Sequence, residues 1–402
     1  MRCSSTGADA RHLRPTTAHP HLTMTMNNGE IRRTSKPCLG ETERIAVQRV
    51  LDSAYLGAGP ETQGFEDELA AYLGGTRSVV CVSSGTAALH LALAAAGLGP
   101  GDEVLVPSLT YVASFQAIAA TGALPVACDV RRQDALIDLD DARLRLTDRT
   151  RAIMPVHFAG HCGDLAAVYA FAASHRLRVI EDAAHAFGTR YQDQLVGSIG
   201  DLVCFSFDPI KNITAGQGGA VVTGDALAAA RIRSARDLGI ERIAGGRDAA
   251  DFDVTHLGWR YALSDLMAAI GRAQLGRFEV ELKPYRQMAA ATYRRRLADV
   301  DGITLLDSGT DVVPHILPVR IAGGARDTVR AALMTAGYET RVHYKPNHLL
   351  RAFAVASPLP VCEGLYQELL TLPLHAGVNT DDIESIAGII EEQLARALRA
   401  CR

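Results

Sequence analysis

The chain has 402 residues, of which 48% are hydrophobic, and a formal net charge of −4 at pH 7. Because a single core rarely grows beyond about 250–300 residues, we expect roughly two domains of an ordinary α/β enzyme. The weak negative charge argues against a nucleic-acid partner, and no apolar run approaches the ~18 residues of a membrane helix.

Eight cysteines are spread along the chain, and no two of them form a CxxC pair. Several lie in apolar strand-like segments, where a free cysteine behaves as a small buried hydrophobe. This usage favours a reducing, cytoplasmic compartment. Residues 1–30 contain no apolar segment of the kind that a secretory signal requires, and we expect them to form a disordered extension.

Strand-like and helix-like patterns alternate from about residue 61 onwards. The expected strands are 78–82, 103–107, 124–128, 151–156, 178–182, 202–206 and 219–223. The expected helices are 64–73, 86–96, 110–121, 163–175 and 225–237. Because short apolar strands separated by helical patterns are typical of βαβ units, we predict a mainly parallel sheet sandwiched by helices. This sheet is expected to form a large domain over residues 31–275.

The second part of the chain has a different pattern. Helical patterns at 263–276 and 279–299 lead away from the large domain. The remaining expected strands are 314–320 and 339–344, and the remaining helices are 325–336, 363–370 and 380–399. We therefore predict a smaller C-terminal α+β domain over residues 276–402. The segment 31–60 is expected to pack with this small domain or to close over the site.

Lys211 is the first candidate functional residue. It lies in CFSFDPIKNITAGQGGAVV (residues 204–222), where an apolar strand delivers one lysine into a polar, glycine-rich segment. Lysine is seldom buried. This residue is therefore either an ordinary surface residue or an amine placed for chemistry.

A candidate phosphate site precedes Lys211 in the chain. In SSGTAALHLAL, the strand 78–82 is followed by Ser84-Gly85-Thr86 and a helix begins. The free N–H groups and the positive dipole end of a helix N-terminus bind anions. Glycine allows close approach, and Thr86 adds a hydroxyl. The same residues also fit a helix that is merely N-capped after a strand.

Asp182 ends the expected strand 178–182, at the position where open α/β sheets bind ligands. A carboxylate there can favour the protonated form of a pyridine ring, and its alternative role is to cap the next helix. A phosphate anchor, a strand-end carboxylate and a lysine, in this order, are what enzymes that use pyridoxal phosphate (PLP) need.

Three further side chains follow strands of the same sheet. His185 comes three residues after Asp182 and could reach the phenolic oxygen of the cofactor. Tyr111 follows strand 103–107 and could stack on a pyridine ring. Ser206 ends strand 202–206 and could add a hydroxyl to the phosphate site. For His185 and Tyr111 taken alone, packing in the core is the alternative.

Two competing sites are not supported. The segment VHFAGHC places His157, His161 and Cys162 at a spacing found in metal sites. Gly160 interrupts this segment after a strand, so no helix would align the three side chains, and we expect no metal. A Rossmann dinucleotide site is also not expected, because no GxGxxG follows the first strand.

Several segments together resemble one protein family. They are GPETQGFEDELAAYLG, SSGTAALHLAL, GPGDEVLVPSLTYVAS, MPVHFAGHCGDL, VIEDAAHAFG, SFDPIKNITAGQGGAVV, LGWRYALSDLMAAIGRAQL, TRVHYKP and LTLPLHAGV. From about residue 38 to 400, the chain resembles the DegT/DnrJ/StrS-type sugar aminotransferases. These are fold-type I PLP enzymes of the aspartate aminotransferase superfamily, so the resemblance implies PLP as the cofactor.

The resemblance implies a role for each candidate residue. Lys211 would join PLP as an imine and act as the base, and Asp182 would contact the pyridine nitrogen. The other implied roles are phosphate binding by Gly85, Thr86 and Ser206, ring stacking by Tyr111, and a hydrogen bond from His185 to the phenolic oxygen.

The chain departs from the family pattern at two motifs. The usual GEGG reads GQGG at 216–219, and the usual GYNYRM reads GWRYAL at 258–263. Arg260 therefore stands where the family has an asparagine that reaches a neighbouring subunit's phosphate, and we expect Arg260 to do the same by charge. His343, in TRVHYKP, is the expected substrate-binding residue.

We therefore expect a homodimeric PLP aminotransferase with shared active sites. It would move an amino group from L-glutamate onto a nucleotide-linked keto-sugar, such as a keto-deoxyhexose in amino-sugar biosynthesis. A keto-cyclitol acceptor and a PLP-binding regulator without turnover are the alternatives. A sister group of dehydratases has histidine in place of the lysine, so Lys211 argues against that activity.

Overall fold

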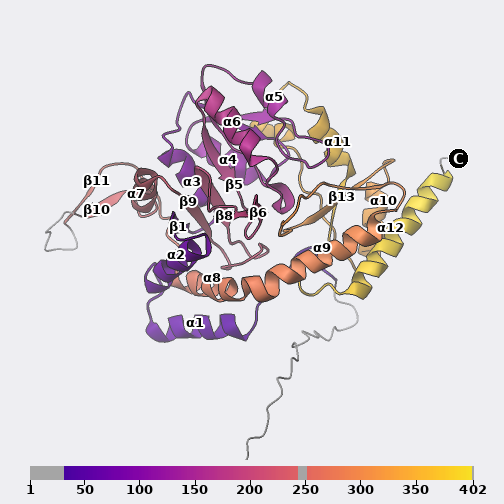
Figure 1. Cartoon of the computed structure of the whole chain (residues 1–402), viewed down its shortest axis with the longest axis horizontal. Helices are drawn as coiled ribbons and strands as arrows, with labels where there is room; N and C mark the ends of the chain where they lie inside the picture. The colour runs from indigo at the N-terminus through magenta and orange to yellow at the C-terminus, as the bar shows by residue number, and fades with distance from the viewer. Residues whose placement is uncertain (1–30, 243–250, 401–402) are drawn as a thin grey trace, which may run out of the picture. The chain divides into compact units, whose positions relative to one another are not determined.

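The computed structural model describes residues 31–242 and 251–400. The extension expected at residues 1–30 lies outside the described residues. Figure 1 shows a central sheet with helices around it. In spatial order its strands are β1 (Ser78–Val82), β9 (Gly219–Thr223), β8 (Leu202–Ser206), β5 (Arg178–Asp182), β4 (Thr150–Ile153), β2 (Glu103–Pro107) and β3 (Leu124–Cys128).

The direction of the strands decides where the connecting loops lie. Strands β8, β5, β4, β2 and β3 are parallel, and β9 runs antiparallel to both β1 and β8. The predicted mainly parallel sheet is confirmed. Because β9 is reversed, it begins at the edge where β8 ends, so the connection 207–218 stays at the carboxyl edge of the parallel strands.

Alternating residues of the strands explain why helices cover both faces of the sheet. In β1, Val80 and Val82 pack into one apolar cluster, and Val79 and Cys81 pack into another. Parallel strands that are buried on both faces read as continuous apolar runs. The helices of this part are α2 (Pro60–Tyr72), α3 (Gly85–Ala95), α4 (Val112–Ala120), α5 (Leu139–Leu144), α6 (Leu165–His175) and α7 (Ala226–Ala235).

Two helices connect the sheet to the C-terminal part of the chain. They are α8 (Asp265–Arg277) and α9 (Lys283–Leu297), and a π-helical turn at Phe278–Leu282 joins them end to end (Figure 1). Phe278 and Leu282 are both buried in a core cluster of the sheet. The expected helices 263–276 and 279–299 are thus present, and no loop separates them.

The C-terminal part has its own antiparallel sheet and core. Its strands are β12 (Ile303–Leu305), β13 (Leu317–Ile321) and β14 (Leu369–Leu372), and its helices are α10 (Arg326–Thr335), α11 (Pro360–Glu368) and α12 (Thr380–Ala400). Tyr293 and Leu297 of α9 pack into this core. Among the described residues, no helix is long and apolar enough to cross a membrane.

The strand predicted at 339–344 is wrong. Only a single bridge forms there, between Arg341 and Thr371 of β14. Directly after this bridge, His343 and Tyr344 make side-chain contacts instead of extending a ladder. Pro346 follows, and it has no N–H to donate to a sheet.

The N-terminal described segment and two short antiparallel strand pairs were not predicted as regular structure. Residue Arg32 forms a bridge with Tyr338 of the C-terminal part, whereas α1 (Glu41–Ser53) packs its Ala46 and Val50 against Ala269 of α8. The short strands are β6 (Arg190–Tyr191), β7 (Gln194–Leu195), β10 (Ile240–Arg242) and β11 (Phe252–Val254). The domain boundary at 275/276 stays a prediction.

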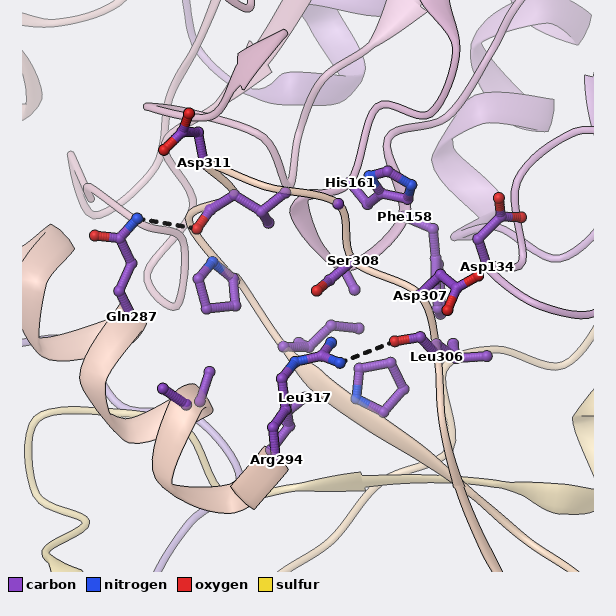
Figure 2. Close-up of a pocket in the computed structure, with 18 residues that line it drawn as sticks. Asp134, Phe158, His161, Gln287, Arg294, Leu306, Asp307, Ser308, Asp311 and Leu317 are labelled. Atoms are coloured by element: carbon purple, nitrogen blue, oxygen red, sulfur yellow. Dashed lines mark hydrogen bonds between the residues drawn. The ribbon is translucent and has the colours of Figure 1, made fainter. Parts of the chain in front are cut away.

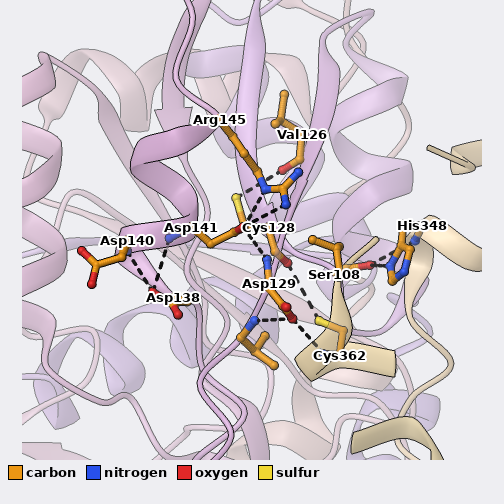
Figure 3. A network of polar contacts seen from close by, with 12 residues as sticks. Ser108, Val126, Cys128, Asp129, Asp138, Asp140, Asp141, Arg145, His348 and Cys362 are labelled. Carbon is orange, nitrogen blue, oxygen red and sulfur yellow. Dashed lines mark hydrogen bonds and ion pairs between the residues drawn. The ribbon is translucent and has the colours of Figure 1, made fainter. Parts of the chain in front are cut away.

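A polar network joins the ends of β2 and β3 to the segment around α11 (Figure 3). The carboxylate of Asp129 accepts hydrogen bonds from the backbone of Val361 (3.0 Å) and Cys362 (2.7 Å). The hydroxyl of Ser108 lies 2.7 Å from Nδ1 of His348. Both contacts span more than 200 residues, so they fix the 343–363 stretch against the carboxyl edge of the sheet.

Candidate active site

The candidate site lies at the carboxyl edge of the central sheet. Gly85, Tyr111 and Asp182 stand at or just after the ends of β1, β2 and β5, and Ser206 ends β8. Lys211 lies in the β8–β9 connection, which stays at the same edge because β9 is antiparallel. The sheet therefore gathers these sequence-predicted residues from distant segments.

The turn that carries Lys211 is held by its neighbours. The N–H of Lys211 donates to the carbonyl of Asp208 (3.1 Å). The side chain of Asn212 is buried, and its Nδ2 donates to the carbonyls of Phe187 (3.1 Å) and Val313 (3.2 Å). The lysine thus projects from a turn whose backbone is fixed on both sides.

The surroundings of Lys211 favour its neutral form. Burial lowers the pKa of Lys211 to about 8, although the carboxylates of Asp182 and Asp208 act in the opposite direction. Arg286 adds a further lowering of this pKa. An appreciable fraction of the amine is therefore neutral just above pH 7, as a nucleophile or a general base requires.

Asp182 is buried and oriented by a hydroxyl that the sequence analysis did not identify. Ser114 Oγ donates to Asp182 Oδ2 (2.8 Å), and the N–H of Ala184 donates to Oδ1 (3.2 Å). The hydroxyl of Thr110 lies 3.0 Å from Ser114 Oγ. This chain of hydroxyls fixes the plane of the carboxylate.

His185 belongs to an aromatic cluster. Its Nε2 lies 3.2 Å from the hydroxyl of Tyr344, and its ring centroid lies 4.4 Å from that of His315. Burial, with a contribution from Lys211, holds the pKa of both histidines well below the usual value, so both rings are neutral. Nδ1 of each ring is buried without a hydrogen-bond partner among the described residues.

The start of α3 forms a cradle with the end of β8. Ser84 caps this helix by accepting a hydrogen bond from the N–H of Ala87 (3.1 Å). A Cβ added at Gly85 would stand 2.8 Å from Cβ of Ser206, so glycine is required for the close approach of these two segments. Thr86 is exposed at the mouth of this cradle.

Tyr111 is an exposed aromatic residue beside the site. It is the N-cap residue of α4, and 58% of its surface is accessible. Its ring centroid lies 5.7 Å from that of Tyr344. The core-packing alternative for Tyr111 therefore does not hold, whereas His185 is buried.

His343 and Arg260 lie in different surroundings. Nδ1 of His343 lies 2.8 Å from the hydroxyl of Thr371, and burial, with contributions from Lys211 and Arg341, lowers the pKa of His343 to about 4. Arg260 is exposed and precedes Tyr261, whose carbonyl accepts from the N–H of Ser83 (2.7 Å). The side chain of Arg260 makes no hydrogen bond or ion pair with the other described residues.

The segment VHFAGHC does not form a metal site in the described part of the chain. His157 Nε2 lies 2.8 Å from Glu181 Oε2, and both side chains are buried. His161 instead borders a separate cavity of about 200 Å³, near Asp134 and Asp307 (Figure 2). Over residues 31–242 and 251–400, no group of three or more His, Cys, Asp or Glu could hold a metal ion.

Sequence reasoning missed Ser114, His315, Tyr344 and Arg286. Ser114 and Tyr344 lie in segments that carry candidate residues, TYVAS and TRVHYKP, so their proximity was a usable signal. His315 and Arg286 stand alone in the sequence. They reach the site only because the C-terminal part packs against the β8–β9 connection.

Comparison with known proteins gives consistent matches. A family model described as the DegT/DnrJ/EryC1/StrS aminotransferase family matches residues 37–391. The structure of the aminotransferase TlmJ from Streptoalloteichus hindustanus is 33% identical, with 91% of this chain and 99% of that chain covered and a TM-score of 0.84. DesV from S. venezuelae is 37% identical, with coverages of 87% and 93% and a TM-score of 0.80. The putative sugar aminotransferase Spr1654 from Streptococcus pneumoniae, in its PLP form, is 28% identical, with coverages of 90% and 98% and a TM-score of 0.84.

The lowered pKa of Lys211 leads to a prediction about stability without any bound ligand. Below pH 8 both folded and unfolded chains are protonated at this residue, and the folded chain carries the cost of a desolvated charge. This cost fades as pH rises from about 8 towards the ordinary value of 10.5, because the folded state loses its proton first. Lys211→Met should therefore stabilise the ligand-free protein at pH 7 by on the order of 2–3 kcal/mol, and this gain should fall by about half at pH 9.5.

Urea denaturation at the two pH values measures this difference. The matched control is Lys345→Met, which removes an exposed lysine and should show no comparable gain. A stability difference for Lys211→Met that does not change with pH would contradict burial as the cause of the lowered pKa of Lys211.

Proposed function

The chain belongs to the DegT/DnrJ/EryC1/StrS aminotransferase family and is a PLP-dependent sugar aminotransferase, and we propose that it transfers the amino group of L-glutamate to a nucleotide-linked keto-sugar. The proposed acceptor is a keto-deoxyhexose of amino-sugar biosynthesis. The observation that carries the proposal is the pairing of a desolvated lysine, Lys211, with a buried and oriented carboxylate, Asp182. These are the two groups that amino transfer needs at opposite ends of one cofactor ring.

The residues of the site fit PLP in space and in charge. The cradle at Gly85 and Ser206 offers the N–H groups of a helix N-terminus to a phosphate. Asp182 supplies the negative charge that a protonated pyridine nitrogen needs. The unpartnered Nδ1 of His185 is left for a hydrogen bond with the phenolic oxygen.

The proposed mechanism assigns a separate task to each side chain. When bound, PLP withdraws electrons from the carbon next to the transferred nitrogen. Asp182 would stabilise the positive charge of a protonated pyridine nitrogen, and Ser114 would fix the orientation of that carboxylate. Lys211 would hold the cofactor through Nζ, and the same nitrogen, when free, would act as the base that takes up and returns the transferred proton.

Four other residues would position the reactants. Thr86 and Ser206 would bind the phosphate through their hydroxyls, and the exposed ring of Tyr111 would cover the face of the pyridine. His343 is neutral at physiological pH. It can therefore exchange hydrogen bonds with a sugar hydroxyl without adding a charge beside Lys211.

We further propose a homodimer with shared active sites. Large apolar side chains are exposed on α1 (Ile45 and Leu51) and on β11 (Phe252 and Val254), and apolar surface of this kind suits a subunit interface. Arg260 would reach the phosphate of the partner's site, because its planar fork makes paired, charge-assisted bonds to phosphate.

A cytoplasmic location is also proposed. The cysteines at 38, 81, 128, 162, 204 and 362 are all free. Buried free thiols are typical of proteins that reside in a reducing compartment.

The acceptor is tested with a panel of nucleotide-linked keto-sugars and keto-cyclitols. The purified protein, PLP and isotopically labelled L-glutamate are combined with each acceptor, and labelled nitrogen is sought in the product by mass spectrometry. We expect transfer to a nucleotide-linked keto-deoxyhexose and formation of 2-oxoglutarate. Transfer only to keto-cyclitols would reassign the acceptor, and binding of PLP without conversion of L-glutamate would indicate a regulator.

Asp182→Asn is expected to keep the fold and to lower turnover on the order of a thousandfold, equivalent to about 4 kcal/mol in the barrier. The neutral amide no longer favours the protonated pyridine. Ser114→Ala is the graded comparison, since it keeps the carboxylate and removes only its orienting bond, and it should cost far less. Near-normal turnover of Asp182→Asn at normal PLP content would show that Asp182 only fixes the turn after β5, where it accepts from the N–H of Ala184.

Mixed dimers test the trans role of Arg260. Lys211→Ala chains lack the attachment amine, and Arg260→Ala chains should bind PLP poorly. In a mixed dimer, one site combines an intact Lys211 with the partner's intact arginine, so joint refolding should restore up to half of normal activity per mixed dimer. Full activity of Arg260→Ala alone, or no recovery after mixing is confirmed, would rule out the shared site.

A further inference from the structure

Arg286 links the Lys211 turn to the segment that precedes β13. It lies in the first turn of α9, with only 7% of its surface exposed. Its Nη1 donates to the carbonyls of Pro314 (3.4 Å) and His315 (3.2 Å), and its Nη2 donates to the carbonyl of Lys211 (3.4 Å). The planar fork of a guanidinium offers a separate nitrogen to each side, whereas a lysine would have to reach both sides from one nitrogen.

Two neighbouring side chains fix the same segment. Gln287 Nε2 donates to the carbonyl of Val312 (3.1 Å; Figure 2). Asn212, directly after the lysine, donates to the carbonyl of Val313 (3.2 Å). The carbonyls of residues 312–315 therefore accept hydrogen bonds from side chains of α9 and of the lysine turn. Arg286 lies on α9 and is the side chain that also contacts the backbone of the lysine turn.

Arg286 is also a buried positive charge. Within the described part of the chain, no carboxylate forms an ion pair with it, and its hydrogen bonds go to backbone carbonyls. Burial lowers the pKa of Arg286 to about 10, so it stays protonated at neutral pH. A buried cation of this kind disfavours a second positive charge close by.

The amine of Lys211 is the group that this charge affects. Asp182 at the end of β5 and Asp208 in the lysine turn both raise the pKa of Lys211, whereas Arg286 and burial lower it. The other titratable groups that face the amine are the neutral imidazoles of His185, His315 and His343. Arg286 thus opposes the two carboxylates.

We propose that Arg286 is a positioning residue for the amination reaction: its guanidinium holds the Lys211 turn against residues 314–315 and, as a nearby cation, favours the neutral form of the Lys211 amine. The inference rests on the proposed role of Lys211. It concerns the free amine, however, and can be tested in the protein without its cofactor.

The test uses the small number of lysines, which are Lys36, Lys211, Lys283 and Lys345 in the whole chain. Cofactor-free protein is acetylated briefly over a range of pH, and peptide mass spectrometry gives the reactivity of each lysine. The variants are Arg286→Met and Arg286→Lys. Arg294→Met is the matched control, because Arg294 lies on the same helix and donates to the carbonyl of Leu306 (3.0 Å; Figure 2), away from the lysine turn.

Arg286→Met should raise the apparent pKa of Lys211 and so slow its acetylation at pH 7, while burial still keeps this pKa below the ordinary value of 10.5. Arg294→Met should leave this pKa unchanged. Arg286→Lys keeps the charge but not the fork, so it should leave the pKa near the wild-type value and release bound PLP faster on gel filtration. A folded Arg286→Met protein with the wild-type pKa of Lys211 would overturn the proposal.

Arg286→Lys decides the question if Arg286→Met does not fold. Wild-type retention of PLP by Arg286→Lys would then overturn the positioning role, and faster release with an unchanged pKa would support it. Failure of the proposed function has a different signature. Borohydride reduction of the wild-type holoenzyme would then place the pyridoxyl group on a lysine other than Lys211, whereas the acetylation result would still stand.

Discussion

The site depends on lowering the pKa of one amine while two carboxylates stand near it. Asp182 and Asp208 both favour the charged form of Lys211, and burial outweighs them. Burial is available here because the β8–β9 connection folds back over the carboxyl edge of the sheet and the C-terminal part packs against it. If the connection faced open solvent, the pKa of Lys211 would not fall below its ordinary value of 10.5, and a far smaller fraction of the amine would be neutral near pH 7.

The histidines near the amine add no further charge to its surroundings. His185, His315 and His343 are all held neutral, so the surroundings of Lys211 contain hydrogen-bonding rings instead of further cations. The buried carboxylate of Asp182 accepts hydrogen bonds from Ser114 and from a backbone N–H. A negatively charged phosphate would be bound at the opposite end of the site, by the backbone N–H groups at the N-terminus of α3.

The sheet could be predicted closely from the sequence, and the surface elements could not. Strands β1, β8 and β9 have the predicted limits because strands buried on both faces show as apolar runs. Helix α1 was missed because it buries only three of its thirteen residues and so shows little apolar pattern. In the site, Lys211 and Asp182 were predictable from local motifs. Their partners Arg286 and Ser114 lie 75 and 68 residues away, and no local pattern reports a contact across that distance.

The continuity of α8 and α9 has a mechanical consequence. Helix α8 is anchored to the central sheet through the cluster that contains Ala268, and the far end of α9 is anchored in the C-terminal core through Tyr293 and Leu297. Arg286 lies one turn beyond the π-helical joint, on helix α9, which leads into the C-terminal core. If α9 moves relative to α8 about this joint, the guanidinium of Arg286 moves with it, and its hydrogen bond to the Lys211 carbonyl lengthens or breaks. A displacement of the C-terminal part would therefore reach the backbone of the turn that carries the reactive amine.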